Sequence, residues 1–234
     1  MDIASLGAHS TSLQQAKLLE RSNSLRRRIE AWTDIQHLYI PSIAVIRARA
    51  DQQGGGNPVA VQDIELLLPS ALQGRLVVPI DFLRYEWELR LTHAEETLAE
   101  LRSLLLMRSM MYRSKERHMR GQKQQTKGQN LIKGIQQRIT MAARKYRQSR
   151  QALITLATPL LQSSSWETKL LTLSDDDLVG LTSLDDDGPE GRKKLSWIWK
   201  VQGMHLDEDK NTQLGMYRFI SECAIFLKLF SSPS

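Results

Sequence analysis

Apolar residues recur at helical spacing along one long stretch of the chain, residues 82–161. They form two series that step by four and three, which places one apolar stripe on each of two helices. The first series is Trp87, Leu91, Ala94, Leu98, Leu101, Leu105 and Tyr112, with one gap at Arg108, and the second is Leu131, Ile135, Ala142, Tyr146, Leu153, Leu156 and Leu160. Residues 121–130, between the two series, carry no apolar side chain. The pattern predicts a long antiparallel helical hairpin, with helices over about 81–120 and 128–161 and Asp81 as the first N-cap.

The part of the chain before this stretch predicts further helices. A third apolar series predicts a helix from Thr11 to about Tyr39, which Pro41 ends or kinks because proline lacks an N–H donor. A short helix can resume over 42–50, and the glycine-rich residues 54–58 predict a flexible linker. Residues 59–68 are predicted to be a short helix rather than an extended piece, and residues 76–80 are β-prone but have no second strand to pair with.

The composition changes after the second long helix. Pro159 is expected to end the regular part of that helix, and a segment with two aspartate triplets follows. The fold class predicted is all-α: a long, coiled-coil-like antiparallel hairpin with additional packed helices and flexible linkers. The predicted organisation is an N-terminal helical segment (1–53), a Gly-rich linker (54–58), the hairpin (59–161), an acidic loop (162–192), and a Ser-Trp-Ile-Trp block with a short C-terminal segment (193–234).

Composition supports a helical protein and narrows the cellular compartment in which we expect it. Of 234 residues, 41% are hydrophobic but only 6% aromatic, so the core is expected to be aliphatic, as in helix bundles. Cys223 is the single cysteine, which excludes a disulfide framework and favours a reducing compartment. The N-terminus lacks the pattern of a signal peptide, and no stretch is apolar enough to span a membrane. We expect an intracellular protein, nuclear or cytoplasmic, with no membrane partner.

Charge is distributed unevenly along the chain. Residues 108–150 hold thirteen basic side chains and one acidic one, +12, whereas residues 167–190 hold eight acidic and one basic, −7, in a chain of net charge +6. The functional interpretation is that the hairpin tip binds nucleic-acid phosphates through charge neutralisation. The candidate residues are Arg113, Lys115, Arg117, Arg120, Lys123 and Lys127. The alternative is a solvated helix face that the chain's own acidic segment balances.

Catalytic and metal-binding patterns are weak. The five histidines are scattered without HxxxH or HExxH spacing, and residues 121–127 lack the spacing of a P-loop. The aspartate triplets, 175–177 and 185–187, have no sheet around them to hold two metal ions, so a solvated acidic loop is the preferred interpretation. We therefore expect no enzymatic activity, no metal, no cofactor and no small-molecule ligand, and we take Cys223 as a buried small apolar residue.

An ordered set of segments between about residues 14 and 200 resembles a known family. The segments are Leu83-Arg-Tyr-Glu-Trp-Glu-Leu-Arg90, Leu98-Ala-Glu-Leu-Arg102, Gly121-Gln122 with Thr126-Lys127, Ala142-Ala-Arg-Lys-Tyr-Arg147, Arg150-Gln-Ala-Leu153, Glu190-Gly-Arg192 and Leu195-Ser-Trp-Ile-Trp199. Together they resemble the C-terminal region of fungal KDZ (Kyakuja–Dileera–Zisupton) transposase-like proteins. Those proteins carry an RNase H-like core and a cysteine-rich cluster, and this chain matches neither, so no catalytic residue transfers. From about residue 210 onward the sequence departs from the family.

The resemblance implies a non-catalytic accessory or assembly module, similar to the tail of such a transposase. The basic hairpin tip adds the expectation of weak, non-specific DNA binding. Two alternatives stay open. One is a structural coiled-coil homo-oligomer, joined through the helical stripes, with no role in nucleic-acid binding. The other is a degenerate transposon-derived fragment without a selected function.

Overall fold

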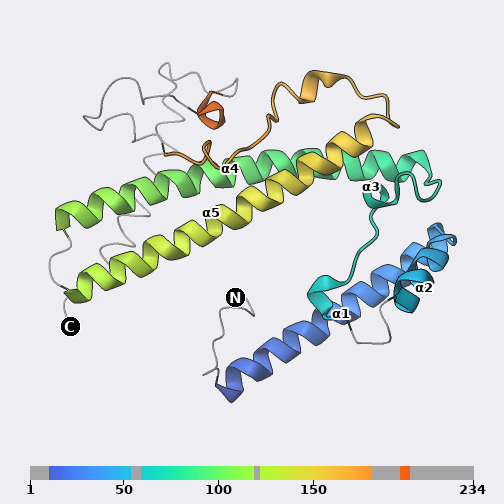
Figure 1. The fold of residues 1–234 in the computed structure, drawn as a ribbon, viewed down its shortest axis with the longest axis horizontal. Coiled ribbons are helices and arrows are strands. Elements are labelled where there is room, and N and C mark those ends of the chain that lie inside the picture. Colours follow the sequence, from blue (N-terminus) through green and yellow to red (C-terminus); the bar gives the residue numbers. More distant parts are fainter. Residues whose placement is uncertain (1–10, 54–58, 119–121, 181–195, 201–234) are drawn as a thin grey trace. The chain divides into compact units, whose positions relative to one another are not determined.

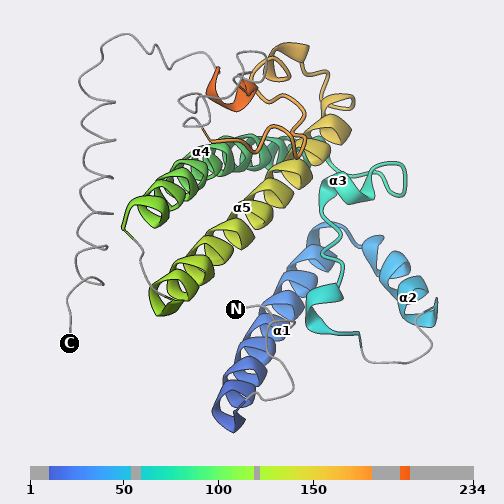
Figure 2. The ribbon, with the colours of Figure 1, turned by 60° about the vertical axis from the view of Figure 1, so that its left-hand side comes forward.

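The computed structural model describes residues 11–53, 59–118, 122–180 and 196–200, and within these ranges the regular elements are helices, with no strand (Figure 1). Their contacts divide the chain into two units: unit 1 is Met1–His93 with Gln148–Ser163, and unit 2 is Ala94–Arg147 with Ser164–Ser234. The two longest helices, α4 (Ile80–His118) and α5 (Gln122–Ala157), contribute to both units. They run side by side in two views of the ribbon (Figures 1 and 2). The all-α prediction is confirmed for the described residues.

The N-terminal helix of unit 1 begins where the sequence predicts. Helix α1 spans Ser12–Tyr39, and Thr11 is its N-cap. The Thr11 hydroxyl accepts from the N–H of Gln14, while the Gln14 side chain accepts from the N–H of Thr11, so each satisfies a backbone donor that the first turn leaves unpaired. The helix ends before Pro41, and α2 (Ile43–Gln53) follows with Ile43 fully buried.

The connection between α2 and α4 is mostly irregular in its described part. It contains a 3₁₀ turn, η2 (Val61–Asp63), and one short helix, α3 (Pro69–Leu72). The helix predicted over 59–68 is therefore wrong apart from that turn. Pro69 disfavours helix in the residue before it, and Leu67 takes a left-handed backbone conformation, with φ of 49°. Residues 76–80 form no strand, as expected for a β-prone piece without a partner.

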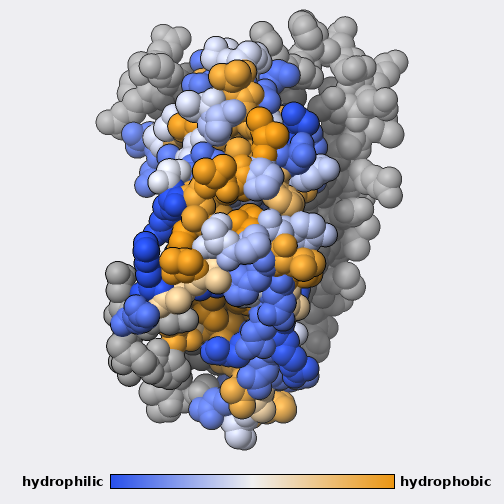
Figure 3. All heavy atoms as spheres, turned by 90° about the vertical axis from the view of Figure 1, so that its right-hand side faces the viewer, coloured by the Kyte–Doolittle hydropathy of each residue, from blue (hydrophilic) through white to orange (hydrophobic). Residues whose placement is uncertain are grey.

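The ends of the two long helices in unit 1 follow local backbone rules. Helix α4 begins at Ile80, so the N-cap position falls at Pro79, Asp81 lies inside the first turn, and its prediction as N-cap is wrong by two residues. A carboxylate there still stabilises the positive end of the helix dipole. Helix α5 ends at Ala157, two residues before Pro159, so Pro159 follows the end of the regular helix as expected, but the helix stops four residues short of the predicted Leu161. Unit 1 leaves several apolar side chains exposed, including Val77 and Leu161, and Figure 3 shows hydrophobic residues on one face of the molecule.

The core of unit 2 contains most of the predicted stripe residues that belong to this unit. From α4, Leu98, Leu101 and Leu105 are buried, and from α5 Ala142 and Tyr146 are buried as well. Ile135 is also buried. Leu131, however, is 41% exposed, and its predicted place in the core is wrong. The buried stripe continues instead through Ile132 and Ile139, which lie three positions before and four positions after the buried Ile135, so that all three share one face of the helix.

The second long helix starts earlier than predicted. Helix α5 begins at Gln122, not at 128 or 129, so most of the predicted polar turn is helical. Glutamine and lysine have good helix propensity, so a stretch without apolar residues is compatible with an exposed helix as well as with a turn. Gly128 lies in the interior of α5 and is buried. The residues between the two helices, 119–121, lie outside the described part of the chain.

Candidate nucleic-acid interface and arginine groove

The six predicted nucleic-acid-binding residues lie around the junction of α4 and α5. Arg113 on α4 and Lys127 on α5 are exposed. Lys115 and Arg117 belong to α4 and Lys123 to α5, but their side chains lie outside the described part of the structure. Arg120 lies outside the described residues altogether. The structure therefore places two of the six cationic side chains, one on each helix.

The described chain extends the basic surface well beyond this junction. Helix α5 contains eight basic residues and no acidic residue along its 36 residues, whereas α4 contains seven of each. The exposed basic residues on the part of α5 that belongs to unit 2 are Lys127, Lys133, Arg138, Arg144 and Lys145. Arg138 pairs with Glu100 of α4 at 3.7 Å, and both side chains remain largely exposed. Such an exposed ion pair contributes little to stability, and it leaves most of the positive charge of α5 unneutralised.

The acidic segment that follows α5 is not simply a solvated loop. Residues 164–180, which we call the strap, begin with a 3₁₀ turn, η3 (Ser164–Trp166), and bury Trp166, Leu170 and Leu173. A Cβ added at Gly180 would overlap Ser109 of α4, so a side chain does not fit where the strap meets this helix. In this described part the acidic side chains Glu167, Asp175 and Asp176 are exposed, whereas the apolar side chains of Trp166, Leu170 and Leu173 are buried. Residues 181–192 of the predicted acidic loop lie outside the description.

Side-chain donors on the helices hold the strap through its backbone carbonyls. The Tyr146 hydroxyl donates to the carbonyl of Leu171 at 2.7 Å, and Arg147 Nε donates to that of Leu173 at 3.0 Å. An extended segment with no neighbouring strand has carbonyls that need donors from elsewhere, and these side chains supply them. The strap therefore folds back against the helices of unit 2 instead of extending from the end of α5 (Figure 2).

Arg108 of α4 provides a further contact to the strap and occupies an unusual position in its helix. It fills the gap in the apolar series of α4 and is neither fully buried nor fully exposed. One terminal nitrogen donates to Gln136 Oε1 and the other to the carbonyl of Leu178, both at 2.7 Å. Burial lowers the pKa of the Arg108 guanidinium, partly offset by Tyr112, but from an ordinary value so high that the group stays charged at neutral pH.

Arg147 of α5 makes an ion pair with the strap. Its Nη2 donates to Asp175 Oδ1 at 2.6 Å, and the Asp175 side chain is 86% exposed. Arg108, Thr140, Arg147 and Asp175 line a groove of about 280 Å³ within unit 2. We call this the arginine groove. Two arginines and one aspartate leave its lining with a charge of +1.

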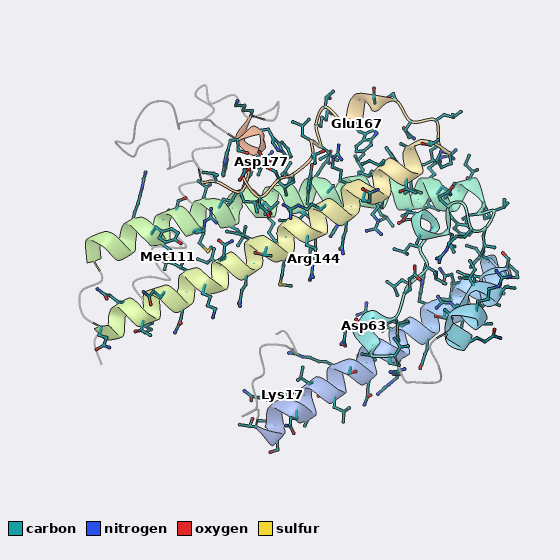
Figure 4. The ribbon with its side chains drawn as sticks, viewed as in Figure 1. Lys17, Asp63, Met111, Arg144, Glu167 and Asp177 are labelled. Carbon is teal, nitrogen blue, oxygen red and sulfur yellow. The ribbon has the colours of Figure 1, made fainter. Side chains whose placement is uncertain are left out.

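The neighbouring Asp177 has a structural role. It accepts hydrogen bonds from the N–H and hydroxyl of Ser174, at 2.9 and 2.8 Å, and from the hydroxyl of Ser196 at 3.1 Å. Partial burial alone would raise its pKa, but these hydrogen bonds outweigh burial and hold the pKa below its ordinary value. Figure 4 shows Asp177 in the strap, beside the turn η6 (Trp197–Trp199).

The turn η6 also bonds directly to the strap and to α4. Trp199 Nε1 donates to the carbonyl of Val179 at 2.9 Å, and Arg102 Nε donates to the carbonyl of Ile198 at 2.8 Å. Burial lowers the pKa of Arg102 as well, with a smaller opposing effect from Tyr146. The distinctive Ser-Trp-Ile-Trp block is thus a packing element of unit 2, with Ile198 and Trp199 buried.

A serine–histidine pair in unit 1 has the wrong exposure for catalysis. His93 Nδ1 lies 2.8 Å from Ser149 Oγ, a distance compatible with activation of a nucleophile. Ser149 is 0% exposed, however, so a substrate cannot reach its hydroxyl, and the bond is a link between α4 and α5. In the described ranges, no three His, Cys, Asp or Glu side chains gather as metal ligands.

Comparison with known proteins identified no relative of the chain. No family model, curated protein or solved structure matches the chain. Among the helices of the described residues, none combines the length and apolar content needed to cross a membrane. The proposed function therefore rests on the helices, the strap and their charges.

Proposed function

We propose that the chain is a non-catalytic helical accessory module that binds nucleic acid weakly and without sequence preference. The observation that carries this proposal is the charge of α5, which has eight basic and no acidic residues along about 54 Å of helix at 1.5 Å per residue. Phosphate neutralisation and counterion release need only such an array of exposed cations. Base-specific recognition would need additional side chains directed at base edges, and we propose none.

The hairpin arrangement is part of this proposal. Two pairs in unit 2 support antiparallel helices, because Glu100 pairs with Arg138 and, further along α4, Arg108 bonds to Gln136 at a lower number on α5. We propose that residues 119–121 close a tight hairpin whose junction carries the six predicted cations. The resemblance to the tail of KDZ transposase-like proteins supports a place beside DNA, as an assembly element rather than as the catalyst.

The experiment that tests this proposal compares two variants with equal loss of charge. In one, Lys127, Lys133, Arg144 and Lys145 of α5 become Gln. In the other, Lys17, Arg21, Arg27 and Arg28 of α1, which are also exposed, become Gln. Binding to a short DNA duplex is measured over a range of salt concentrations. Each phosphate contact contributes about 0.9 to the slope of log affinity against log salt, so the α5 variant should show a much flatter slope.

The α1 variant should keep nearly the parental slope, and circular dichroism should show that both variants stay helical. A third variant, with Arg117, Arg120, Lys123 and Lys127 changed to Gln, measures how much the hairpin junction contributes to DNA binding. Equal slopes for the α1 and α5 variants would mean that net charge alone attracts DNA, and the proposed interface would be abandoned.

A second candidate function is homo-oligomerisation through α1. The single buried side chain of this 28-residue helix is Gln36, and its exposed large apolar residues are Leu13, Leu19, Leu25, Trp32, Ile35, Leu38 and Tyr39. Exposed apolar residues on one helix are typical of a surface that another chain covers. We expect sedimentation equilibrium to give a mass above that of the single chain and Leu38→Gln to lower it. A monomeric parent chain would exclude this candidate.

A further inference from the structure

The arginine groove contains a cation whose charge the described chain does not neutralise. Both hydrogen-bond partners of Arg108 in that part of the chain are neutral oxygens, the Gln136 amide and the Leu178 carbonyl. These bonds fix the plane of the guanidinium without cancelling its charge. Fixing an arginine in advance reduces the entropy lost when an anion binds, which is how rigid binding sites gain affinity.

Arg147 presents a second guanidinium to the same groove, and it already holds an anion. Its Nε is fixed by the Leu173 carbonyl, and its Nη2 binds Asp175 at 2.6 Å. The Asp175 side chain is 86% exposed, and an exposed ion pair of this kind contributes little to stability. An external anion can therefore take the place of the Asp175 carboxylate at little cost.

We propose that the arginine groove binds a phosphate group through Arg108 and Arg147, with Asp175 as an internal anion that competes for the site. Guanidinium groups match phosphate oxygens with paired, charge-assisted hydrogen bonds. The groove volume of about 280 Å³ lies at the lower end of the range for ligand pockets, which suits a small phosphorylated group. This proposal departs from the expectation, drawn from the sequence, that the chain has no small-molecule ligand.

The proposal does not depend on the proposed interface with DNA. The groove uses Arg108 and Arg147, whereas the interface uses the exposed cations of α5, such as Arg144, which lies at the outer edge of that helix in Figure 4. The phosphate could belong to a nucleic-acid backbone or to a free phosphate compound. The chemistry of recognition is the same for both, and the experiment below separates them.

The test titrates the full chain with inorganic phosphate at constant ionic strength and follows arginine side-chain signals by NMR. The decisive pair of variants is Thr140→Glu and Gln137→Glu. Each adds one negative charge to an exposed position of α5, but Thr140 lines the groove and Gln137 does not. Neither residue bonds to the strap through a contact in the described structure, so the strap anchors stay in place. We expect Thr140→Glu to weaken phosphate binding about tenfold or more, because the added carboxylate repels the phosphate and competes for the two guanidinium groups, and losing one hydrogen bond to a charged group has an effect of about this size.

A second matched pair tests the competition by Asp175. Asp175→Asn should tighten phosphate binding, because the internal anion is removed, whereas Asp176→Asn changes the net charge equally and should have a smaller effect. Arg108→Gln should weaken binding, and Arg144→Gln should weaken it much less. Equal losses in Thr140→Glu and Gln137→Glu, or no phosphate-dependent signal in the parent and in Asp175→Asn, would overturn the proposal.

A final arm identifies the source of the phosphate. A short DNA duplex is added to the chain saturated with inorganic phosphate, and the arginine signals of the groove are followed. Displacement of the phosphate supports a nucleic-acid backbone as the ligand, and retention supports a free phosphate compound. Failure of DNA binding would show in the duplex titration alone and would leave the phosphate titration as an independent result.

Discussion

Each unit contains an irregular segment that side chains, rather than a sheet, hold against the helices. In unit 1 the carbonyls of Leu66 and Leu67 accept hydrogen bonds from Gln36 Nε2, at 3.2 and 2.7 Å. In unit 2 the strap carbonyls accept from Tyr146, Arg147 and Arg108. Both solve the same problem, since backbone carbonyls that leave water need a donor.

The two segments differ in the chemistry of the donor. Gln36 is 4% exposed and neutral, and the Arg47 side chain completes its bonding by donating to Gln36 Oε1 at 2.7 Å. That arrangement satisfies its polar atoms and leaves nothing for a ligand. The arginines of unit 2 also bind carbonyls, but carbonyls do not cancel their charge. The same backbone requirement thus gives a purely structural contact in one unit and a candidate anion site in the other.

The largest effect is expected for the core on which the strap rests. Leu101 is 0% exposed, and Leu101→Ala should destabilise the chain by about 2–5 kcal/mol, through lost apolar burial and a residual cavity. Leu131, which the sequence pattern placed in the same core, is the matched control. Because it is exposed, Leu131→Ala should change the free energy of unfolding by no more than about 0.5 kcal/mol. Denaturant titration measures both, and equal losses would show that the buried face of α5 is assigned wrongly.

A smaller loss of stability is expected when the Gln36 contact of unit 1 is removed. Gln36→Ala removes the donor to the buried carbonyl of Leu67 and the acceptor for Arg47, whereas Trp32 still donates to the carbonyl of Leu66, so the change should cost about 1–3 kcal/mol. Gln52→Ala, at an exposed position of α2, is the control and should be nearly neutral. Neither change should alter phosphate or DNA binding. Loss of phosphate binding in Gln36→Ala would contradict the distinction between a structural contact and an anion site.

Local patterns predicted the helices well where a specific side chain marks the boundary. Pro41 follows the end of α1 and Pro159 follows the end of α5, because proline acts through nearest-neighbour backbone rules. The start of α5 could not be predicted from polarity, because glutamines and lysines are compatible with an exposed helix as well as with a turn. The misplaced Leu131 has a similar cause, since a stripe read from spacing alone allows an error of one position.

The arginine groove depends on contacts between residues far apart in the sequence, which spacing does not reveal. One signal was present: Arg108 interrupts an apolar series, and a charged residue on a buried face must find partners. The partner proved to be a carbonyl seventy positions away, at Leu178. Nothing in the composition of the strap distinguishes its structural Asp177 from the exposed Asp175, because the distinction arises from the serines that surround Asp177 once the strap is folded.

The smallest effect tests the strap through the titration of Asp177. Its pKa is lower in the folded chain than the ordinary value of about 3.9, because hydrogen bonds favour the charged form. The stability that this group contributes is therefore fully present above that ordinary value and is lost as the pH falls through the lower, folded value. Asp177→Asn should be less stable than the parent at pH 6, and the difference should shrink below about pH 4.

The exposure of Asp177 limits the size of this difference in stability. The Asp177 carboxylate is only partly buried, so solvent screening should keep the effect below about 1 kcal/mol. Asp176→Asn is the control, because Asp176 is an exposed neighbour. Thermal unfolding followed by tryptophan fluorescence is a suitable measurement, since Trp199 bonds to the strap at Val179. A difference between Asp177→Asn and the parent that did not change between pH 6 and pH 3 would show that the serine hydrogen bonds stabilise the strap equally with a neutral acceptor. The charge of Asp177 would then play no part in holding the strap, and Arg108, Arg147 and Tyr146 would be its main anchors.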